Sequence, residues 1–265
     1  MRRGLATVMG VVNVTPDSFH AGSRTAATAD AIERGRRLFA EGAGIVDVGG
    51  ESTRPGATPV EADEELARVL PVVEALASLG RVSVDTVKPQ VARAAVAAGA
   101  TLLNDVGGSL GPLAAALGVG WVAMHHRGIP AERAPETSGP GLVDEVRRRV
   151  LGAARAAREL GVDELYVDPG IGFGKGADGN LALLARLDEL CDASHAEGIG
   201  VLVGASRKRF LGALPHGDAL EAEERFEGSL AVATYAMACG ADVVRVHDVA
   251  ATAQAAALVA DGEAA

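Results

Sequence analysis

The chain has 265 residues, of which 48% are hydrophobic and 23% charged, so it holds enough apolar material for a large folded core. Its formal net charge of -10 argues against a broad nucleic-acid-binding face, because that function needs a basic surface. The two cysteines, Cys191 and Cys239, form no CxxC pair, so a disulfide framework is not indicated and a reducing compartment fits.

No apolar run approaches the roughly 18 residues that a membrane-spanning helix needs. The basic start, Met1-Arg2-Arg3, merges directly into an expected core strand. We therefore expect neither a signal peptide nor a transmembrane helix, which predicts a cytoplasmic protein without a membrane partner.

Short runs rich in Val, Ile and Leu recur along the chain and predict strands. They are Val8–Val14, Ile45–Val48, Val82–Val84, Leu102–Leu103, Trp121–Met124, Leu165–Val167, Val201–Val203 and Val243–Val246. Apolar stripes with helical spacing lie between them, at Leu66–Leu76, Val143–Leu160 and Leu181–Leu190. Strand alternating with helix predicts a parallel sheet, and eight such units predict an α/β protein with a closed (β/α)8 TIM barrel. The competing fold is an open doubly wound sheet, which usually has fewer strands.

No shift in composition and no long linker divides the chain, so we expect one domain over residues 1–265. Each predicted strand ends at a polar residue: Asn13, Asp47, Asp85, Asn104, His125, Asp168, Ser206 and His247. In the third strand Ser83 and Asp85 share one face, opposite to Val82 and Val84. The apolar faces of a barrel meet the helices, so the polar residues should point into the C-terminal mouth, where barrel active sites lie.

The connections after the first two strands are ambiguous on local chemistry alone. The segment Asn13-Val14-Thr15-Pro16-Asp17-Ser18-Phe19 is typical of an ordinary turn that leads to a helix. In the second, Asp47–Gly56, glycines, hydroxyls and Arg54 suit the grip of an oxyanion, but a plain Gly/Pro connector is as consistent with them.

The sixth strand leads into Asp168-Pro169-Gly170-Ile171-Gly172-Phe173-Gly174-Lys175. The glycine spacing fits neither a P-loop nor a dinucleotide-binding fingerprint, because Pro169, Gly176 and Lys175 stand at positions those motifs need for other residues. We expect a flexible glycine loop beside a carboxylate that faces the mouth.

The seventh strand is followed by three consecutive cations, Arg207, Lys208 and Arg209, at a point where a helix is expected to open. Such a position favours an anion site, with a solvated basic turn as the alternative. The chain's only lysines, Lys88, Lys175 and Lys208, each lie beside one of these motifs. His125-His126 does not predict a zinc site, because adjacent strand residues point to opposite faces and no third ligand has suitable spacing.

Taken in order, these segments resemble dihydropteroate synthases over about residues 8–250. The matching stretches are MGVVNVTPDSF, DVGGESTRPGA, SVDTVKPQVA, AGATLLNDVGG, MHHRG, DPGIGFGK, GASRKRFLG and VRVHDV. The resemblance implies a transferase of folate biosynthesis. It would condense 6-hydroxymethyl-7,8-dihydropterin diphosphate with p-aminobenzoate to give 7,8-dihydropteroate and pyrophosphate, and sulfonamides would compete. A homodimer is a further expectation from the resemblance.

The resemblance also implies a role for particular side chains of this sequence. Asp85, Asn104 and Asp168 would hold the pterin, Lys208 would bond its acceptor side, and Arg245 would stack on its ring. Asn13 and His247 would meet the diphosphate, with Mg2+ near Asn13. The aminobenzoate pocket would be completed by Phe19, Thr53, Arg54, Pro55, Ser206 and Arg209. The main catalytic contributions would come from Arg54, Lys208, Arg245 and His247.

Two positions depart from the family pattern, and two other functions stay open. His20-Ala21-Gly22-Ser23 replaces a usual Ser-Asp-Gly-Gly, and Gly107 stands where Ser is common. One alternative is a methyltransferase of the same barrel family, which moves a methyl group from a reduced folate to a corrinoid. The other is a catalytically silent paralogue that binds pterin.

Overall fold

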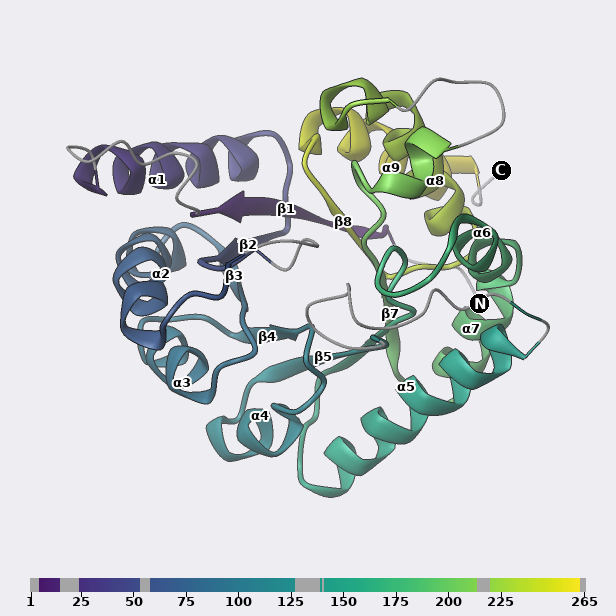
Figure 1. The fold of residues 1–265 in the computed structure, drawn as a ribbon, viewed down its shortest axis with the longest axis horizontal. Coiled ribbons are helices and arrows are strands. Elements are labelled where there is room, and N and C mark those ends of the chain that lie inside the picture. The colour runs from purple at the N-terminus through teal and green to yellow at the C-terminus, as the bar shows by residue number, and fades with distance from the viewer. Residues whose placement is uncertain are drawn as a thin grey trace.

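The computed structural model describes residues 5–14, 24–52, 58–126, 139, 141–213 and 220–262. Eight parallel strands follow one another around a closed barrel, and helices surround them (Figure 1). The strands are β1 (Thr7–Asn13), β2 (Ile45–Gly49), β3 (Arg81–Asp85), β4 (Leu102–Asp105), β5 (Gly120–Met124), β6 (Leu165–Asp168), β7 (Gly200–Val203) and β8 (Val243–Val246). The predicted (β/α)8 barrel is confirmed. The predicted domain range 1–265 extends beyond the described residues at both ends and stays a prediction.

The helices lie on the outer side of the ring (Figure 1). They are α1 (Arg24–Ala40), α2 (Ala62–Ala77), α3 (Pro89–Ala97), α4 (Gly111–Leu117), α5 (Leu142–Glu159), α6 (Ala177–Ala185), α7 (Leu187–His195), α8 (Phe226–Ala238) and α9 (Val249–Gly262). Two 3-10 helices, η3 (Arg209–Ala213) and η4 (Ala222–Arg225), precede α8. No helix of the described ranges is long and apolar enough to cross a membrane.

Alternate side chains of each strand point outward to the helices or inward to the barrel, which gives an outer apolar layer, an inner apolar cluster and an inner polar group. Val82, Val84, Val244 and Val246 are buried in the large core between strands and helices. A second cluster fills the inside of the barrel: Met9, Ile45, Leu102, Val122, Leu202 and Val243. Further along the same inward faces come polar residues, because side chains two apart on a strand share a face. The apolar plug thus forms a floor, and the polar residues occupy the mouth above it.

Two expectations about helices are wrong. The stripe Leu181–Leu190 is not one helix, because the chain leaves the helical conformation at Arg186, with φ -122° and ψ 29°. Leu181, within α6, is 41% exposed. Leu160 was expected in the α5 stripe but follows the helix as its C-cap and is 56% exposed. Apolar spacing continues across both helix ends, so it cannot reveal them.

The segment after β7 also differs from expectation. It opens into the short η3, and α8 begins only at Phe226. An anion bound beside Arg207–Arg209 would therefore not face the N-terminus of a full α-helix, so the favourable helix dipole expected there is missing.

Candidate active site

The polar side chains of the mouth are arranged around the guanidinium of Arg245 on β8. Its Nε donates to Asp47 Oδ2 at 2.7 Å, and its Nη2 donates to Asp85 Oδ2 at 2.8 Å. Asp47 comes from β2 and Asp85 from β3, so three strands meet at one side chain. Bonds along two edges fix the guanidinium plane and leave its faces available for stacking.

Asn104 and Asp168 bring β4 and β6 into the same group. Asn104 Nδ2 donates to Asp47 Oδ2 at 3.0 Å, and Asp168 Oδ1 accepts the backbone N–H of Gly170 at 2.6 Å. A Cβ placed on Gly204 would come within 4.0 Å of Asp168 Oδ2 and 3.6 Å of Arg245 Cβ. Glycine after β7 thus keeps the space between the carboxylate and the guanidinium open.

Lys208 reaches into the mouth from the β7 side. Its ammonium donates to the carbonyl of Ile171 and lies 4.4 Å from the centroid of the Phe173 ring. Gly172 makes this path possible: it has φ +84°, and a Cβ there would come within 2.7 Å of Lys208 Cδ. Lys208 also interacts electrostatically with Asp168, Asp85 and Arg245, which places all four in one site.

Burial shifts the charge states of these groups. It raises the pKa of Asp85 to about 7, with Asp47 adding to the rise and Arg245 opposing it. Burial likewise raises the pKa of Asp168, against Lys208 and the Gly170 N–H, and lowers the pKa of Lys208 to about 8, against Asp168. Carboxyls and an ammonium whose pKa values are shifted by burial beside opposite charges are typical of a functional site.

The ends of β7 and β8 are joined by Ser206 and His247. Ser206 Oγ lies 3.0 Å from His247 Nδ1 and also accepts the His247 backbone N–H at 3.3 Å. The carbonyl of His247 accepts a bond of 2.7 Å from Arg34 on α1. His247 is therefore held at its backbone and at one ring nitrogen.

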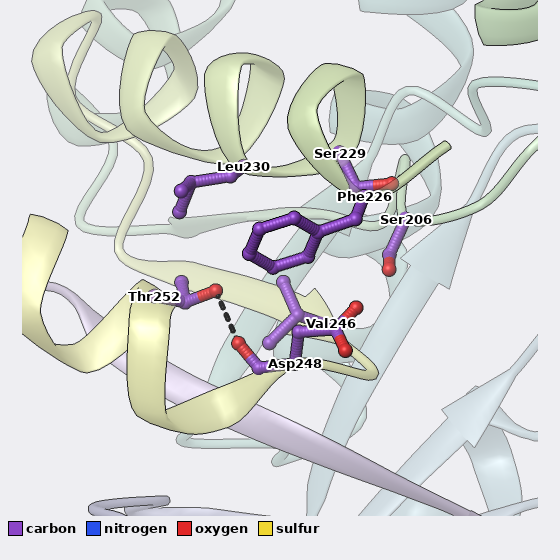
Figure 2. A pocket seen from close by; sticks show the side chains of 7 residues that line it. All are labelled: Ser206, Phe226, Ser229, Leu230, Val246, Asp248 and Thr252. Carbon is purple, nitrogen blue, oxygen red and sulfur yellow. Dashed lines mark hydrogen bonds between the residues drawn. The ribbon is translucent and has the colours of Figure 1, made fainter. Parts of the chain in front are cut away.

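A narrow crevice lies behind Ser206, between β8, α8 and α9 (Figure 2). Phe226 and Leu230 fill it from α8, and Thr252 Oγ1 donates to the Asp248 carbonyl at 2.8 Å (Figure 2). It is too small to admit a water molecule. The crevice is a packing seam that supports the end of β8, with no room for a ligand.

The mouth thus brings together Asp85, Asn104, Asp168, Lys208 and Arg245, with Ser206 and His247 joined at its β7–β8 side. Asn13 ends β1, and its register with Gly49, and through Gly49 with Asp85, gives it the same face. Arg209 is exposed in η3, and nothing in the described contacts joins it to this group. The predicted residues Phe19, Thr53, Arg54 and Pro55, like His20–Ser23, lie outside the described residues.

Three of the cations that lie beside the sequence motifs have structural roles. Arg207 does not bind in the mouth: it pairs with Asp248, and its φ of 58° turns the chain so that neighbouring side chains point in different directions. Lys175 is 5% exposed and donates to the carbonyls of Gly170, Phe173 and His125. The glycine loop is therefore tied down by its own lysine, where a flexible loop was expected.

Lys88 is likewise structural, because it pairs with Glu51 and with fully buried Glu65. His125 was grouped with the mouth residues, but Met124 is in register with inward-facing Asp168, so His125 takes the opposite face. Asp47 was expected in the mouth as a polar residue at a strand end, but the family resemblance gave it no role. Its register with Ser83 gives it the inward face.

Mg2+ would find few protein ligands in the described mouth. No group of three His, Cys, Asp or Glu residues with metal-binding geometry occurs in the described ranges. Asn13 supplies an exposed amide oxygen at the end of β1. A hard oxygen donor fits Mg2+, which commonly keeps water and takes its other ligands from substrate phosphates. The donor set is thus compatible with an ion that arrives with a diphosphate.

A family profile described as pterin binding enzyme matches residues 9–247. The dihydropteroate synthase of Mycobacterium leprae is 45% identical over 260 residues, covering 94% of this chain and 90% of the relative. The chain belongs to the dihydropteroate synthase family.

Solved dihydropteroate synthases share the fold. That of Burkholderia cenocepacia, complexed with 7,8-dihydropteroate, has a TM-score of 0.84 and 44% identity, covering 98% of this chain and 92% of the other. That of Yersinia pestis, with a sulfonamide drug, has a TM-score of 0.86 and 38% identity, covering 98% and 95%. The barrel therefore has the fold of solved dihydropteroate synthases.

Proposed function

We propose that this chain condenses 6-hydroxymethyl-7,8-dihydropterin diphosphate with p-aminobenzoate to give 7,8-dihydropteroate and pyrophosphate. The observation that carries the proposal is the mouth itself, where a planar cation held by its edges lies among carboxylates, an amide and an ammonium. A pterin is a planar ring with adjacent donors and acceptors, so it fits such a set. Relatives at this level of similarity are dihydropteroate synthases, and one holds the product.

In the proposed complex, Asp85, Asn104 and Asp168 bind the polar edge of the pterin. A carboxylate accepts the paired N–H groups of a ring nitrogen and an exocyclic amine. Lys208 donates to the acceptor side of the ring, and Arg245 stacks on its face, which its two edge bonds leave open. These contacts orient the reacting methylene group without forming a bond to it.

The anionic end of the substrate would lie toward Asn13 and His247. Ser206 contacts His247 at Nδ1 and helps to fix the orientation of its imidazole at this end of the site. Mg2+ held by Asn13 and the diphosphate would supply charge neutralisation to the leaving group. Phe19, Thr53, Arg54 and Pro55, with Ser206 and Arg209, would form the aminobenzoate pocket. The family resemblance supports that assignment.

The reaction breaks the bond between the pterin methylene carbon and the diphosphate oxygen, and forms a bond from that carbon to the aminobenzoate nitrogen. Pyrophosphate leaves with the electron pair, and the new amine loses a proton to solvent. Because diphosphate is already a stable anion, no strong general acid is needed. The residues of the mouth would contribute orientation and charge stabilisation.

The proposal is tested by mixing purified protein with the pterin diphosphate, labelled p-aminobenzoate and Mg2+, and counting labelled dihydropteroate. Lys208→Ala should lower kcat/KM by about 100-fold or more, because it removes a buried charged donor to the ring. Arg155→Ala removes a cation of the exposed Arg155–Glu197 pair and serves as the matched control. Absence of product from folded wild-type protein, or near-normal turnover by the Lys208 variant, would contradict the proposal.

The proposal includes a homodimer in the cytoplasm, which the family resemblance supports. Light scattering on the purified chain gives the mass directly. A value near 26.8 kDa, the mass of one chain, would contradict the dimer and leave the assignment of the reaction intact.

A further inference from the structure

Asp47 lies at the centre of the mouth, yet no surface of it is accessible. Its side chain is 0% exposed. One oxygen, Oδ2, accepts from both Arg245 Nε at 2.7 Å and Asn104 Nδ2 at 3.0 Å. A ligand in the mouth therefore cannot touch Asp47 unless the site rearranges. Any effect of this carboxylate on a ligand must pass through its two partners.

The first partner, Arg245, depends on Asp47 for its orientation. Asp85 alone would hold one corner of the guanidinium, at Nη2, and the group could then swing about that contact. The second bond, from Nε to Asp47, fixes the plane. A planar ring stacks well only on a cation whose face has the right tilt, so the second anchor matters to recognition.

The second partner, Asn104, depends on Asp47 for the direction of its amide. Asn104 faces Asp47 with its NH2 end, because that is the end of the amide that can donate to a carboxylate oxygen. The carbonyl oxygen of Asn104 is thereby turned away from Asp47. Without the carboxylate the amide could rotate by half a turn and exchange its donor for its acceptor.

We infer that Asp47 is a positioning residue for pterin recognition, which fixes the Arg245 plane and the Asn104 amide and never contacts the ring. The inference rests on the proposed function, because it takes the pterin as the ligand of the mouth. It adds a fully buried residue to the recognition machinery and gives Asn104 a defined polarity. The pterin must then meet a carbonyl acceptor at the Asn104 position facing away from Asp47.

The test compares Asp47→Ala and Asp47→Asn in the full chain. Calorimetry with the diphosphate-free 6-hydroxymethyl-7,8-dihydropterin gives Kd, and steady-state rates give KM for each substrate. Asp47→Ala removes two hydrogen bonds to the carboxylate and should weaken ring binding by about 10- to 100-fold, with KM for p-aminobenzoate unchanged. Asp47→Asn retains a carbonyl oxygen for both donors and should restore at least half of the loss on a logarithmic scale.

Asp105 provides a matched control, because it is also a buried aspartate but lies on the outer face of β4. It accepts from the Leu110 backbone and from Trp121, away from the mouth. Asp105→Asn should lower the thermal midpoint and leave the pterin Kd within about a factor of two. Equal losses of pterin binding in the Asp47 and Asp105 variants would show a merely structural role and overturn the inference.

If Asp47→Ala fails to fold, Asp47→Asn decides alone: a wild-type Kd together with a wild-type KM for the pterin substrate would overturn the inference. Wild-type protein that binds the pterin but makes no dihydropteroate contradicts the proposed reaction, while the Kd series still decides the role of Asp47. Wild-type protein that does not bind the ring overturns both.

Discussion

The carboxyl of Asp85 interacts electrostatically with charged groups inside the mouth and with others outside it. Asp47 of β2, Arg245 of β8, Glu65 of α2 and Asp105 of β4 all act on it, together with Lys208. Burial is the largest effect and raises its pKa to about 7. In the unliganded protein near pH 7 this carboxyl is therefore protonated in part of the molecules.

We predict that pterin binding releases protons near pH 7, because the proposed contacts need Asp85 as an acceptor. Calorimetry in phosphate and in Tris, which differ in ionisation enthalpy, should show a net release of protons on binding at pH 7. The Kd should fall as the pH rises from 6 to 7.5, and Asp85→Asn should abolish the proton release. Heats that do not depend on the buffer would contradict the assignment.

The same shift has a stability consequence of opposite sense. The folded state holds the Asp85 proton more tightly than the unfolded chain, where an ordinary aspartate titrates near 3.8. Its contribution is thus fully present below about pH 4 and is lost as the pH rises through about 7. Above pH 7 the Asp85 carboxyl is largely deprotonated, so a ligand displaces less proton when it binds. The free protein is somewhat less stable there.

Two residues in similar sequence motifs can have different roles, one in the site and one in the supporting structure, and only the folded structure distinguishes them. Lys175 and Lys208 both follow a strand within a glycine- or arginine-rich motif, yet one binds three carbonyls and the other reaches the mouth. Strand parity predicts Asp85, Asn104, Asp168 and Arg245, because alternation is fixed by the pleat. It does not predict Lys175, whose direction depends on positive φ angles in the loop before it.

At the scale of elements, the connection from β2 to α2 is closed by Glu51. Its Oε1 accepts the backbone N–H of Val60 at 3.0 Å, and its Oε2 pairs with Lys88, which also pairs with Glu65 of α2. Glu51 and Val60 flank the segment that carries Thr53 and Arg54. The two ends of that segment are therefore fastened to each other and to the barrel.

We predict that Glu51→Ala raises KM for p-aminobenzoate by about 10-fold and leaves the pterin Kd unchanged, because the Glu51 contacts join the two ends of the segment to which we assign part of the aminobenzoate pocket. Glu51→Gln, which keeps an oxygen for Val60, should lie between. Glu74→Ala, an exposed substitution on α2, is the control. If Glu51→Ala also weakened pterin binding to a similar degree, Glu51 would be shown to stabilise the whole barrel, and the prediction would be contradicted.

The elements that sequence reasoning placed well are those with a repeating pattern. All eight strands were predicted to within a few residues, because Val/Ile/Leu runs mark buried parallel strands. The break at Arg186 and the short η3 were missed. In both places the apolar residues keep their helical spacing although the backbone leaves the α-helical conformation. The pattern of apolar residues therefore does not reveal these changes in the dihedral angles.

At the scale of the whole molecule, the mouth joins both halves of a closed ring. Its residues come from β2, β3, β4, β6 and β8, with Lys208 after β7, and the ring closes between β1 and β8. A ligand held by all of these strands is bound only while the ring is intact. Binding free energy should therefore appear as stability of the entire barrel.

We predict a single thermal transition that the pterin ring moves upward as a unit. Ligand at about 100 times Kd adds about 2.7 kcal/mol, which for a chain of this size raises Tm by roughly 5–10 °C. At the same ligand concentration Asp47→Ala should lose about half of this increment or more, whereas Asp105→Asn, with a lower starting Tm, should keep it. Scanning calorimetry distinguishes the cases. Two separate transitions, with only one responding to ligand, would show that the ring does not unfold cooperatively and that the mouth belongs to one part of it.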